Sequence, residues 1–471
     1  MDALNTDLLI SLADSQRFAE LSGDFNPLHI DPHRARRTPF GTTVVHGAHV
    51  LLSAFEALAR QGRLGGMEPE GLTVAFSGPV RTGIPFSLRI QDDTNCLRIQ
   101  GHCGDDAVLR VTLVLRRAKG TSWVEEAADF TAQDPQDPGF PPAVTEGATP
   151  LRMNPKTLRA LFPALAQLEE RSWIADLLAT TRIVGMHCPG LHSVFSGMTL
   201  HALATTSSTS AMRFTVSGID ERVRVLRLHV RGARLGGTLD TLFRSRYVQQ
   251  RPLADLLGEV PREAFREARV LVVGGSRGLG ELTAKLITAG GGDVTFTYAR
   301  GHEEAERIVD ETRAVGLRCR AEHMDVLDLA STRTHRLPLA DYSHVYFFAS
   351  PSIRRNPSRW SSELFEQYCA FYVSGFAALV DRLIRERTPR ANPLRVLYPS
   401  TVFLDRPEPG FLEYVTAKAA GEALCRQLSL KHRMQIATPR LPRVLTDQTS
   451  ASSDAADPLP VLLDVIRAQH A

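Results

Sequence analysis

The chain has 471 residues, enough for about three domains of ordinary size, and its 43% apolar content is typical of proteins with buried cores. Basic and acidic residues number 55 and 52, so a net charge of only +3 argues against nucleic-acid binding. The six cysteines form no CxxC pair or zinc spacing, and no apolar run reaches 18 residues. We therefore expect a cytoplasmic protein that acts on small molecules, without a metal site or membrane segment.

The most informative stretch of the sequence is the run Gly23-Asp24-Phe25-Asn26-Pro27-Leu28-His29, with Thr42-Thr43-Val44-Val45-His46-Gly47 shortly after it. Glycine, asparagine and proline disfavour one continuous helix here, so an acid and an imidazole five residues apart can converge on one substrate atom. Taken singly, Asp24 is better explained as an Asx-turn residue and His29 as a buried turn residue. The complete run favours an acid/base pair.

This run resembles the GDxNPxH motif of the MaoC-like, (R)-specific enoyl-thioester hydratases, which have a hotdog fold. The resemblance implies that Asp24 and His29 are catalytic. It also implies that a backbone amide near Gly47, at the start of the central helix, polarises the thioester carbonyl, and a helix N-terminus suits a developing enolate oxygen. A helical pattern at His49–Arg60 and four strand-like runs, the last ending at Arg116, follow as this fold requires.

A second copy of this fold is predicted further along the chain. Residues 121–149 are rich in Asp, Pro, Gly and Ala and indicate a linker. The octet that begins at Gly190 then repeats the octet that begins at Gly71, with five identical positions and an offset of 119 residues. Residues 1–120 and 150–252 are thus expected to form a pseudo-dimer. The second copy lacks the motif, so we expect it to supply the wall of an acyl tunnel.

A nucleotide-binding pattern follows a helical connector at 253–267. The buried strand Val270–Val273 leads into the turn Gly274-Gly275-Ser276-Arg277-Gly278-Leu279-Gly280 and a helix, where glycines let the backbone approach a pyrophosphate. Strands and helices alternate afterwards, which predicts a doubly wound parallel sheet over 268–471. The predicted fold class is therefore an α+β double hotdog followed by an α/β Rossmann-type domain.

Tyr414 and Lys418 lie four residues apart on one face of a predicted helix, where the ammonium can lower the pKa of the phenol for proton donation to a carbonyl. Because the chain has only five lysines, this pairing is informative. Together with the glycine turn, it resembles the short-chain dehydrogenase/reductase family. The resemblance implies that Ser400 or Thr401 holds the substrate carbonyl, and Ser400 is slightly favoured as the family's usual residue.

The expected cofactor is NADP(H), because Arg277 lies in the glycine turn and Arg300, rather than an acid, follows the second strand. The resemblance also implies that Asp325 contacts adenine and that Thr446 lies near the carboxamide. The full expected set of cofactor-binding residues is Gly274, Ser276, Arg277, Gly278, Leu279, Gly280, Arg300, Asp325 and Thr446.

Dehydration and carbonyl reduction share a 3-hydroxyacyl thioester. We therefore expect a bifunctional enzyme of fatty-acid or polyketide-type metabolism that couples NADPH-dependent 3-oxoacyl reduction to dehydration of the (3R)-hydroxyacyl thioester, carried by acyl carrier protein or coenzyme A. A homodimer is compatible with the sequence. One alternative is a hydratase whose reductase-like domain acts on another carbonyl. A second is a non-catalytic acyl-binding protein with an NADP(H)-sensing domain, favoured by the atypical Phe347, Phe348 and Tyr372 and opposed by the retained Tyr414 and Lys418.

Overall fold

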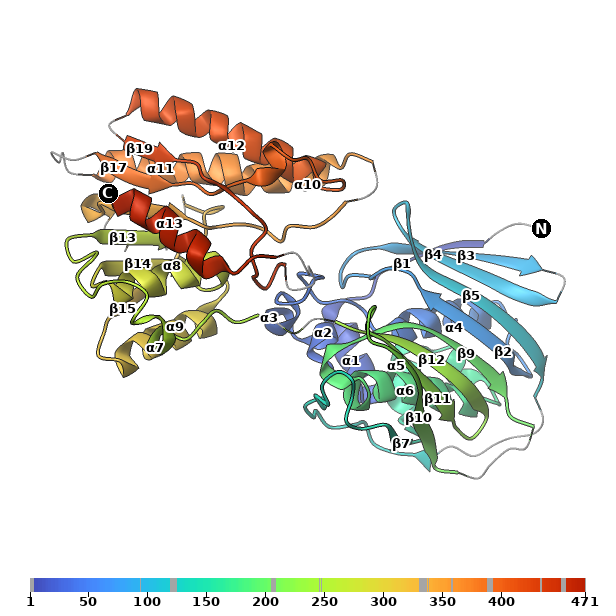
Figure 1. The fold of residues 1–471 in the computed structure, drawn as a ribbon. Coiled ribbons are helices and arrows are strands. Elements are labelled where there is room, and N and C mark those ends of the chain that lie inside the picture. Colours follow the sequence, from blue (N-terminus) through green and yellow to red (C-terminus); the bar gives the residue numbers. More distant parts are fainter. Residues whose placement is uncertain are drawn as a thin grey trace. The chain divides into compact units, whose positions relative to one another are not determined.

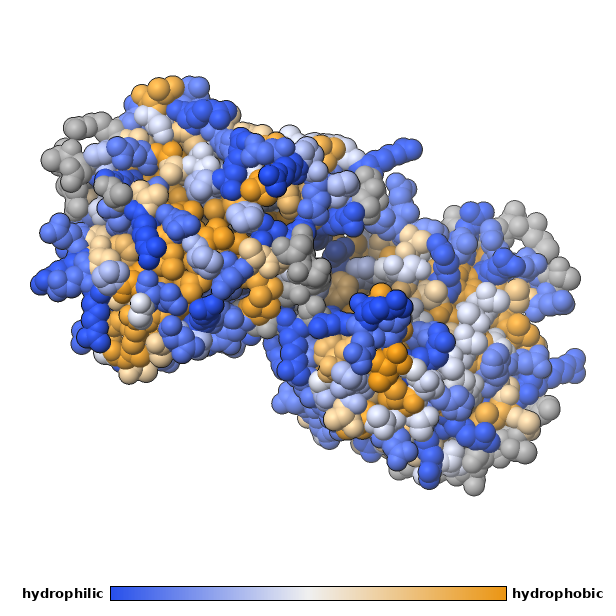
Figure 2. All heavy atoms as spheres, viewed as in Figure 1, coloured by the Kyte–Doolittle hydropathy of each residue, from blue (hydrophilic) through white to orange (hydrophobic). Residues whose placement is uncertain are grey.

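The computed structural model describes residues 4–93, 95–118, 125–204, 209–244, 246, 248–329, 337, 339–356, 359–387, 393–432, 434–449 and 455–470. The chain divides into two compact units, Met1–Arg246 and Tyr247–Ala471 (Figure 1). Hydrophilic side chains cover much of each unit on the face drawn in Figure 2, with hydrophobic patches between them. Among the described helices, none combines the length and the apolar character needed to cross a membrane.

The first unit is built on one ten-stranded antiparallel sheet (Figure 1). In spatial order, its strands are β1 (Leu4–Leu8), β3 (Phe86–Asp93), β4 (Cys96–Cys103), β5 (Asp106–Arg117), β2 (Met67–Phe76), β9 (Ser193–Ala202), β12 (Leu235–Phe243), β11 (Val225–Arg231), β10 (Ala211–Asp220) and β7 (Glu146–Pro150). The first half comprises β1 to β5 and the second half β7 and β9 to β12. Both halves add their strands in the same chain order, and they meet where Leu72 of β2 lies opposite Leu200 of β9.

Each half contributes one long helix to a common core. Helix α4 (Gly47–Arg60) carries apolar residues at helical spacing, and their side chains are buried. Helix α6 (Ser172–Arg182) is buried along its length and contacts α4, where the rings of Phe55 and Trp173 meet at 5.6 Å. The helical pattern predicted at His49–Arg60 is confirmed, since it lies within α4.

The first unit also contains the longer helix α1 (Leu12–Ser22) and several short elements. The short elements are α2 (Pro27–Ile30), α3 (Pro32–Ala35), β6 (Glu125–Glu126), β8 (Arg152–Met153), α5 (Pro155–Leu161), the 3₁₀ turns η1 (Leu165–Gln167) and η3 (Gly190–His192), and the π-helical segment η2 (Ile183–His187).

The segment predicted as a linker is packed against the first unit wherever the structure describes it. Strand β6 pairs with β8, and β7 forms an edge of the large sheet. The Phe130 amide donates to the Glu20 carbonyl, and the Gln136 amide donates to the Met186 carbonyl. In a free linker, these backbone amides and carbonyls would form hydrogen bonds with water instead. Residues 119–124 lie outside the described part of the chain.

The two halves repeat one order of strands, but the repeat does not fall at the offset of 119 residues. The octet at Gly71 lies mostly in β2, whereas the octet at Gly190 begins in η3 and only then enters β9. A bulge precedes Gly71 in β2 and another precedes Gly197 in β9, which aligns the strands 126 residues apart. The five identities at 119 therefore do not mark equivalent positions.

The second unit is a doubly wound α/β fold, as predicted. Its six strands are all parallel, in the order β15 (Cys319–His323), β14 (Asp293–Tyr298), β13 (Arg269–Val273), β16 (His344–Phe347), β17 (Leu394–Leu397) and β19 (Met434–Ala437). The direction of winding reverses between β13 and β16. In open α/β sheets, ligands bind in the crevice at that point.

The other elements of this unit surround the sheet (Figure 1). They are α7 (Leu253–Leu256), α8 (Gly278–Ala289), α9 (His302–Ala314), η5 (Leu339–Asp341), α10 (Ser362–Cys369), π-helical η6 (Ala370–Gly375), α11 (Phe376–Glu386), β18 (Ser400–Thr401), η7 (Val402–Leu404), α12 (Leu412–Lys431), β20 (Arg440–Leu441) and α13 (Pro458–His470). The single helix expected over Ser362–Glu386 is therefore interrupted at η6. The connector helix extends over only four residues, and α13 had not been predicted.

Candidate functional site

The loop that carries the motif lies between two helices of the first half. Helix α1 ends at Gly23, whose φ of 75° is the left-handed conformation that glycine tolerates best. Asn26 caps α2 by accepting a hydrogen bond from the Leu28 amide through Oδ1. Its Nδ2 donates to the carbonyls of Gly185 and Gly190 in the second half. Asp24 thus lies in non-helical backbone, as predicted.

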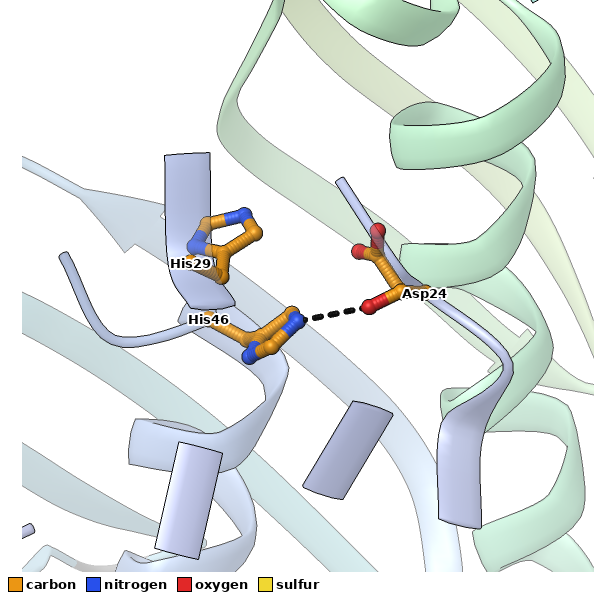
Figure 3. Close-up of side chains that lie close together, drawn as sticks. All are labelled: Asp24, His29 and His46. Carbon is orange, nitrogen blue, oxygen red and sulfur yellow. Dashed lines mark hydrogen bonds between the residues drawn. The ribbon is translucent and has the colours of Figure 1, made fainter. Parts of the chain in front are cut away.

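The structure brings Asp24 and His29 together, and His46 joins them (Figure 3). One carboxylate oxygen and one nitrogen of each imidazole lie within 4.8 Å of one another. Asp24 is buried and His29 is half-buried. His29 Nδ1 donates to the Val44 carbonyl at 2.8 Å, which leaves the lone pair of the neutral ring on Nε2. The two predicted groups can therefore act on one substrate.

His46 was part of the quoted run, but no role had been assigned to it. Its Nε2 donates to the backbone carbonyl of Asp24 at 2.9 Å, and its ring stacks on His29 with 3.9 Å between centroids (Figure 3). The three groups are of types that also bind metal ions. Both carboxylate oxygens of Asp24 and Nε2 of His46 already hold protein hydrogen bonds, however.

The second half holds the motif directly. Thr181 Oγ1 donates to Asp24 Oδ2 at 2.7 Å, and Arg182 Nε donates to the Ser22 carbonyl at 2.5 Å. At Gly185 in η2, an added Cβ would lie 2.1 Å from Asp24 Oδ1, so only glycine allows this approach. Sequence analysis had assigned the second half to a tunnel wall and missed these contacts, since no motif marks Thr181, Arg182 or Gly185.

Burial favours the uncharged forms of both predicted groups. It raises the pKa of Asp24, although His29, Thr181 and Asn26 oppose this. Burial also lowers the pKa of His29 against the opposing effects of Asp24 and Val44, and Arg244 lowers it further. A neutral imidazole that can accept a proton next to a carboxyl that holds one more readily than usual is suited to acid/base chemistry.

Gly47 lies at the first position of α4, immediately after His46. Its amide is among those at a helix start that have no partner within the helix, and it can donate to an oxygen beside the pair. An added Cβ would lie 2.9 Å from the Phe76 ring, so packing also requires glycine here. The structure therefore places the predicted amide next to the acid/base pair.

In the second unit, the glycine turn lies where the direction of winding reverses between β13 and β16. Its backbone closely approaches neighbouring backbone segments. At Gly274 an added Cβ would lie 2.7 Å from the Ala349 amide nitrogen, and at Gly280 it would lie 2.2 Å from the Gly274 carbonyl oxygen. The Gly275 amide donates to the Thr297 carbonyl, and Gly278 opens α8. The turn thus faces a helix N-terminus, an arrangement that suits a phosphate.

The other predicted cofactor residues lie in three places. Arg277 pairs with Asp447 at 2.8 Å, and Thr446 and Asp447 both approach Gly278. Ser276 is buried in the turn, and Leu279 packs on the core beside it. Arg300 is exposed after β14. Asp325 closes an Asx-turn with the Leu327 amide after β15.

Ser400 and Thr401 have different surroundings. Thr401 is the neighbour that lowers the pKa of Tyr414 against the effect of burial. Ser400 Oγ instead donates to Glu422 at 2.6 Å, and Arg440 holds that carboxylate with two hydrogen bonds. The bond to Glu422 disfavours Ser400 as the group that holds a substrate carbonyl, and no local pattern in the sequence reveals this bond. The choice between Ser400 and Thr401 stays a prediction.

Lys418 does not lower the pKa of Tyr414 as predicted. Its Nζ donates to the Pro399 carbonyl and lies 3.8 Å from the centre of the Tyr372 ring. Burial raises the pKa of Tyr414 to about 12 and lowers the pKa of Lys418 to about 7. The Tyr372 hydroxyl is 2.6 Å from Ser350 Oγ. The atypical Tyr372 therefore lies in the predicted site, where its ring contacts the Lys418 ammonium.

Known proteins match the chain in separate regions. Residues 3–102 match the model of the MaoC like domain. The amino-terminal part of the chain is therefore similar to MaoC-like domains. An (R)-specific enoyl-CoA hydratase of Aeromonas caviae is 43% identical over 80 residues, which cover 17% of this chain and 59% of that protein. A probable oxidoreductase of Streptomyces lividans is 33% identical over 111 residues, which cover 22% of this chain and 37% of that protein.

Among solved structures, a dehydrogenase/reductase from Sinorhizobium meliloti 1021 is similar over 46% of this chain and 92% of its own. The sequence identity is 19% and the TM-score is 0.39. The chain thus spans less than two thirds of the length of each of these two curated relatives, 59% and 37%.

The lowered pKa of Lys418 should make the stability of the second unit depend on pH. A lysine in an unfolded chain titrates near ~10.4, so above pH 7 the unfolded chain binds more protons than the folded unit. Stability should then rise between pH 7 and 9, by roughly 1 kcal/mol per pH unit. Pulse proteolysis in urea, with second-unit peptides identified by mass spectrometry, measures this change.

Lys418→Met should remove this slope, and Lys431→Met, an exposed position in the same helix, should keep it. Equal slopes in the unaltered protein and Lys418→Met would contradict the assignment.

Proposed function

We propose that the first unit dehydrates (3R)-hydroxyacyl thioesters and hydrates the enoyl thioesters in the reverse direction. The observation that carries this proposal is the convergence of Asp24, whose pKa is raised, and His29, whose pKa is lowered, near the helix start at Gly47. The similarity to an (R)-specific enoyl-CoA hydratase supports the same reaction. Coenzyme A and acyl carrier protein are both suitable carriers of the acyl group.

The first unit then functions as a double hotdog with one active site. Its halves repeat the same strand order around α4 and α6, and only the first half carries the motif. The second half has a positioning role, since it supplies the hydrogen bond from Thr181 and the space at Gly185 that Asp24 requires. The second half, which lacks the motif, would thus help to position the catalytic acid of the first half.

For the chemistry, the chain supplies a base, an acid and an oxyanion donor. Nε2 of His29 carries a lone pair that can accept a proton, and Asp24 can hold or release one because burial raises its pKa. The Gly47 amide can donate to the thioester oxygen as it gains negative charge. Which of the two side chains removes the α-proton is left open by this geometry, since both lie within reach of one atom.

The second unit is proposed to reduce 3-oxoacyl thioesters with NADPH. The glycines at 274, 278 and 280 and the start of α8 would hold the pyrophosphate, and added Cβ atoms would fill this cradle. The cofactor supplies hydride. Tyr414 and Thr401 would hold the carbonyl oxygen, and Tyr414 would donate the proton. The similarity of part of the chain to a probable oxidoreductase is compatible with a redox role.

The main alternative for the second unit is a domain that binds NADP(H) without turnover. It is favoured by one observation: Lys418 lies on the Tyr372 ring and donates to Pro399, while the pKa of Tyr414 is raised. A phenol with a pKa of about 12 is a weak proton donor at neutral pH. Positive charge would develop on the nicotinamide only as hydride leaves, and it would then favour proton donation by Tyr414, which is why catalysis remains our proposal.

Replacement of Asp24 by Asn, or of His29 by Ala, should lower the dehydration rate by about 10²-fold or more, the usual effect of a positioned acid or base. NADPH oxidation should be unaffected, because that site lies in the other unit. Formation of the enoyl thioester can be followed by mass spectrometry. Asp31→Asn is the matched control, since Asp31 caps α3 in the same region. Unaltered rates in both variants would refute the assignment.

Tyr414→Phe should abolish 3-oxoacyl reduction and leave NADPH binding intact. Thr401→Val should slow reduction by about tenfold or more, whereas Ser400→Ala should have a smaller effect because Ser400 is bound by Glu422. NADPH consumption measures the rate, and cofactor fluorescence measures binding. If the unaltered protein binds NADPH, reduces no 3-oxoacyl thioester and is indistinguishable from Tyr414→Phe, the cofactor-binding alternative replaces this proposal.

NADPH should bind more tightly than NADH, because arginines attract the 2′-phosphate. Arg300→Gln should reduce the ratio of the NADH and NADPH dissociation constants by about tenfold, the scale of one lost charge-assisted hydrogen bond. Arg277→Gln should also reduce this ratio, although this change breaks the pair with Asp447 as well. Titration of cofactor fluorescence gives both affinities, and equal values in the unaltered protein would rule out the preference.

A further inference from the structure

The most constrained group near the acid/base pair is a third imidazole, that of His46. Its side chain is completely buried, and its residue is the one that precedes the first turn of α4. Burial holds the pKa of His46 well below the ordinary value, and the neighbouring His29 lowers it further. Both effects favour the neutral form of the His46 imidazole.

Two contacts connect His46 to both members of the pair. Its Nε2 donates to the main-chain carbonyl of Asp24 at 2.9 Å, which fixes the loop that carries the acid. Its ring lies against the His29 ring at 3.9 Å, with 27° between the planes (Figure 3). Since Nε2 carries the proton, Nδ1 carries the lone pair, and that buried nitrogen has no hydrogen-bond partner among the described residues.

A buried nitrogen without a partner is costly, so a residue chosen for stability alone would be apolar here. An imidazole is the side chain that combines a flat ring with an N–H donor at its far edge. A phenylalanine would keep the stack and lose the hydrogen bond, whereas a glutamine would keep a donor and lose the ring. The position thus requires both properties together.

We propose that His46 is a positioning residue for the hydratase reaction, which holds the Asp24 backbone through Nε2 and fixes the plane of His29 by stacking. This inference rests on the proposed function of the first unit. His46 itself exchanges no proton with the substrate. Its effect is on the distance between Asp24 and His29 and on the hydration of one face of the His29 ring. Small displacements of catalytic groups are expensive for the rate.

The test compares His46→Gln and His46→Phe, with His49→Gln as the matched control. His49 is also a buried imidazole of α4 whose Nδ1 lacks a partner among the described residues, but it stacks on Phe18 at 4.5 Å rather than on His29. All three variants therefore lose a buried imidazole at the start of α4 or directly before it. Only the His46 variants change a residue that contacts Asp24 and His29.

Both His46 variants should lower kcat for dehydration by about tenfold or more, with KM changed by less than about threefold. His46→Gln should also raise the pKa of His29 by about 0.5, because water gains access to the exposed ring face, and should move the pH–rate profile equally. His46→Phe should leave that pKa unchanged. The charged or titratable neighbours of this stack are Asp24, His49 and Arg244, and all are kept in these variants.

His49→Gln should keep the kcat and the profile of the unaltered protein. If it reduces kcat as much as His46→Gln does, or if the His46 variants change only the melting temperature, His46 has a merely structural role and the proposal is overturned.

The NMR spectrum of His29 separates this question from the proposed function. Absence of hydration of any enoyl thioester by the unaltered protein would refute the hydratase assignment. The His29 tautomer and pKa would still report on positioning, and identical values in the unaltered protein and in both His46 variants would overturn the proposal by themselves.

Discussion

The burial of the Asp24 carboxyl group against the second half is the constraint on which the first unit depends. Thr181 donates to one oxygen, the Asn26 amide donates to the other, and Gly185 provides the space. A buried carboxyl without such donors would be strongly destabilising. The two halves must therefore keep their register, which the β2–β9 pairing and the α4–α6 contact provide. The second half lacks the motif, but the surroundings of Asp24 are built partly from it.

Sequence reasoning succeeded where chemistry lies in one contiguous run. The motif from Gly23 to His29 contains its own helix end, Asx cap and proline, so local rules were sufficient. The glycine turn is likewise preceded by a strand and followed by a helix, which is the context that gives such a turn its meaning. The parallel order of the second sheet followed from the alternation of these elements.

Sequence reasoning was insufficient where a residue's role depends on a distant partner. Ser400 and Thr401 are adjacent, alternate in direction on a short strand, and differ only in what each side chain meets: Glu422 in one case and Tyr414 in the other. The repeat offset failed for a related reason, since identical letters at 119 residues fall on different parts of the two strands. Thr181 and Gly185 lie more than 150 residues from Asp24, and nothing in their local sequence points to it.

Each unit buries one acidic and one basic side chain close together, in surroundings that disfavour the charged form of both. In the first unit, burial raises the pKa of Asp24 and lowers that of His29; in the second, it raises that of Tyr414 and lowers that of Lys418. A neutral pair costs less to bury than an ion pair that lacks further hydrogen bonds. The consequence differs between the units. A carboxyl with a raised pKa beside an imidazole with a lowered pKa is suited to proton exchange, whereas a phenol with a pKa of about 12 is a weak proton donor at neutral pH. Under the proposed functions, the first site would need no further group, and the second would need the positive charge that develops on a nicotinamide as hydride leaves.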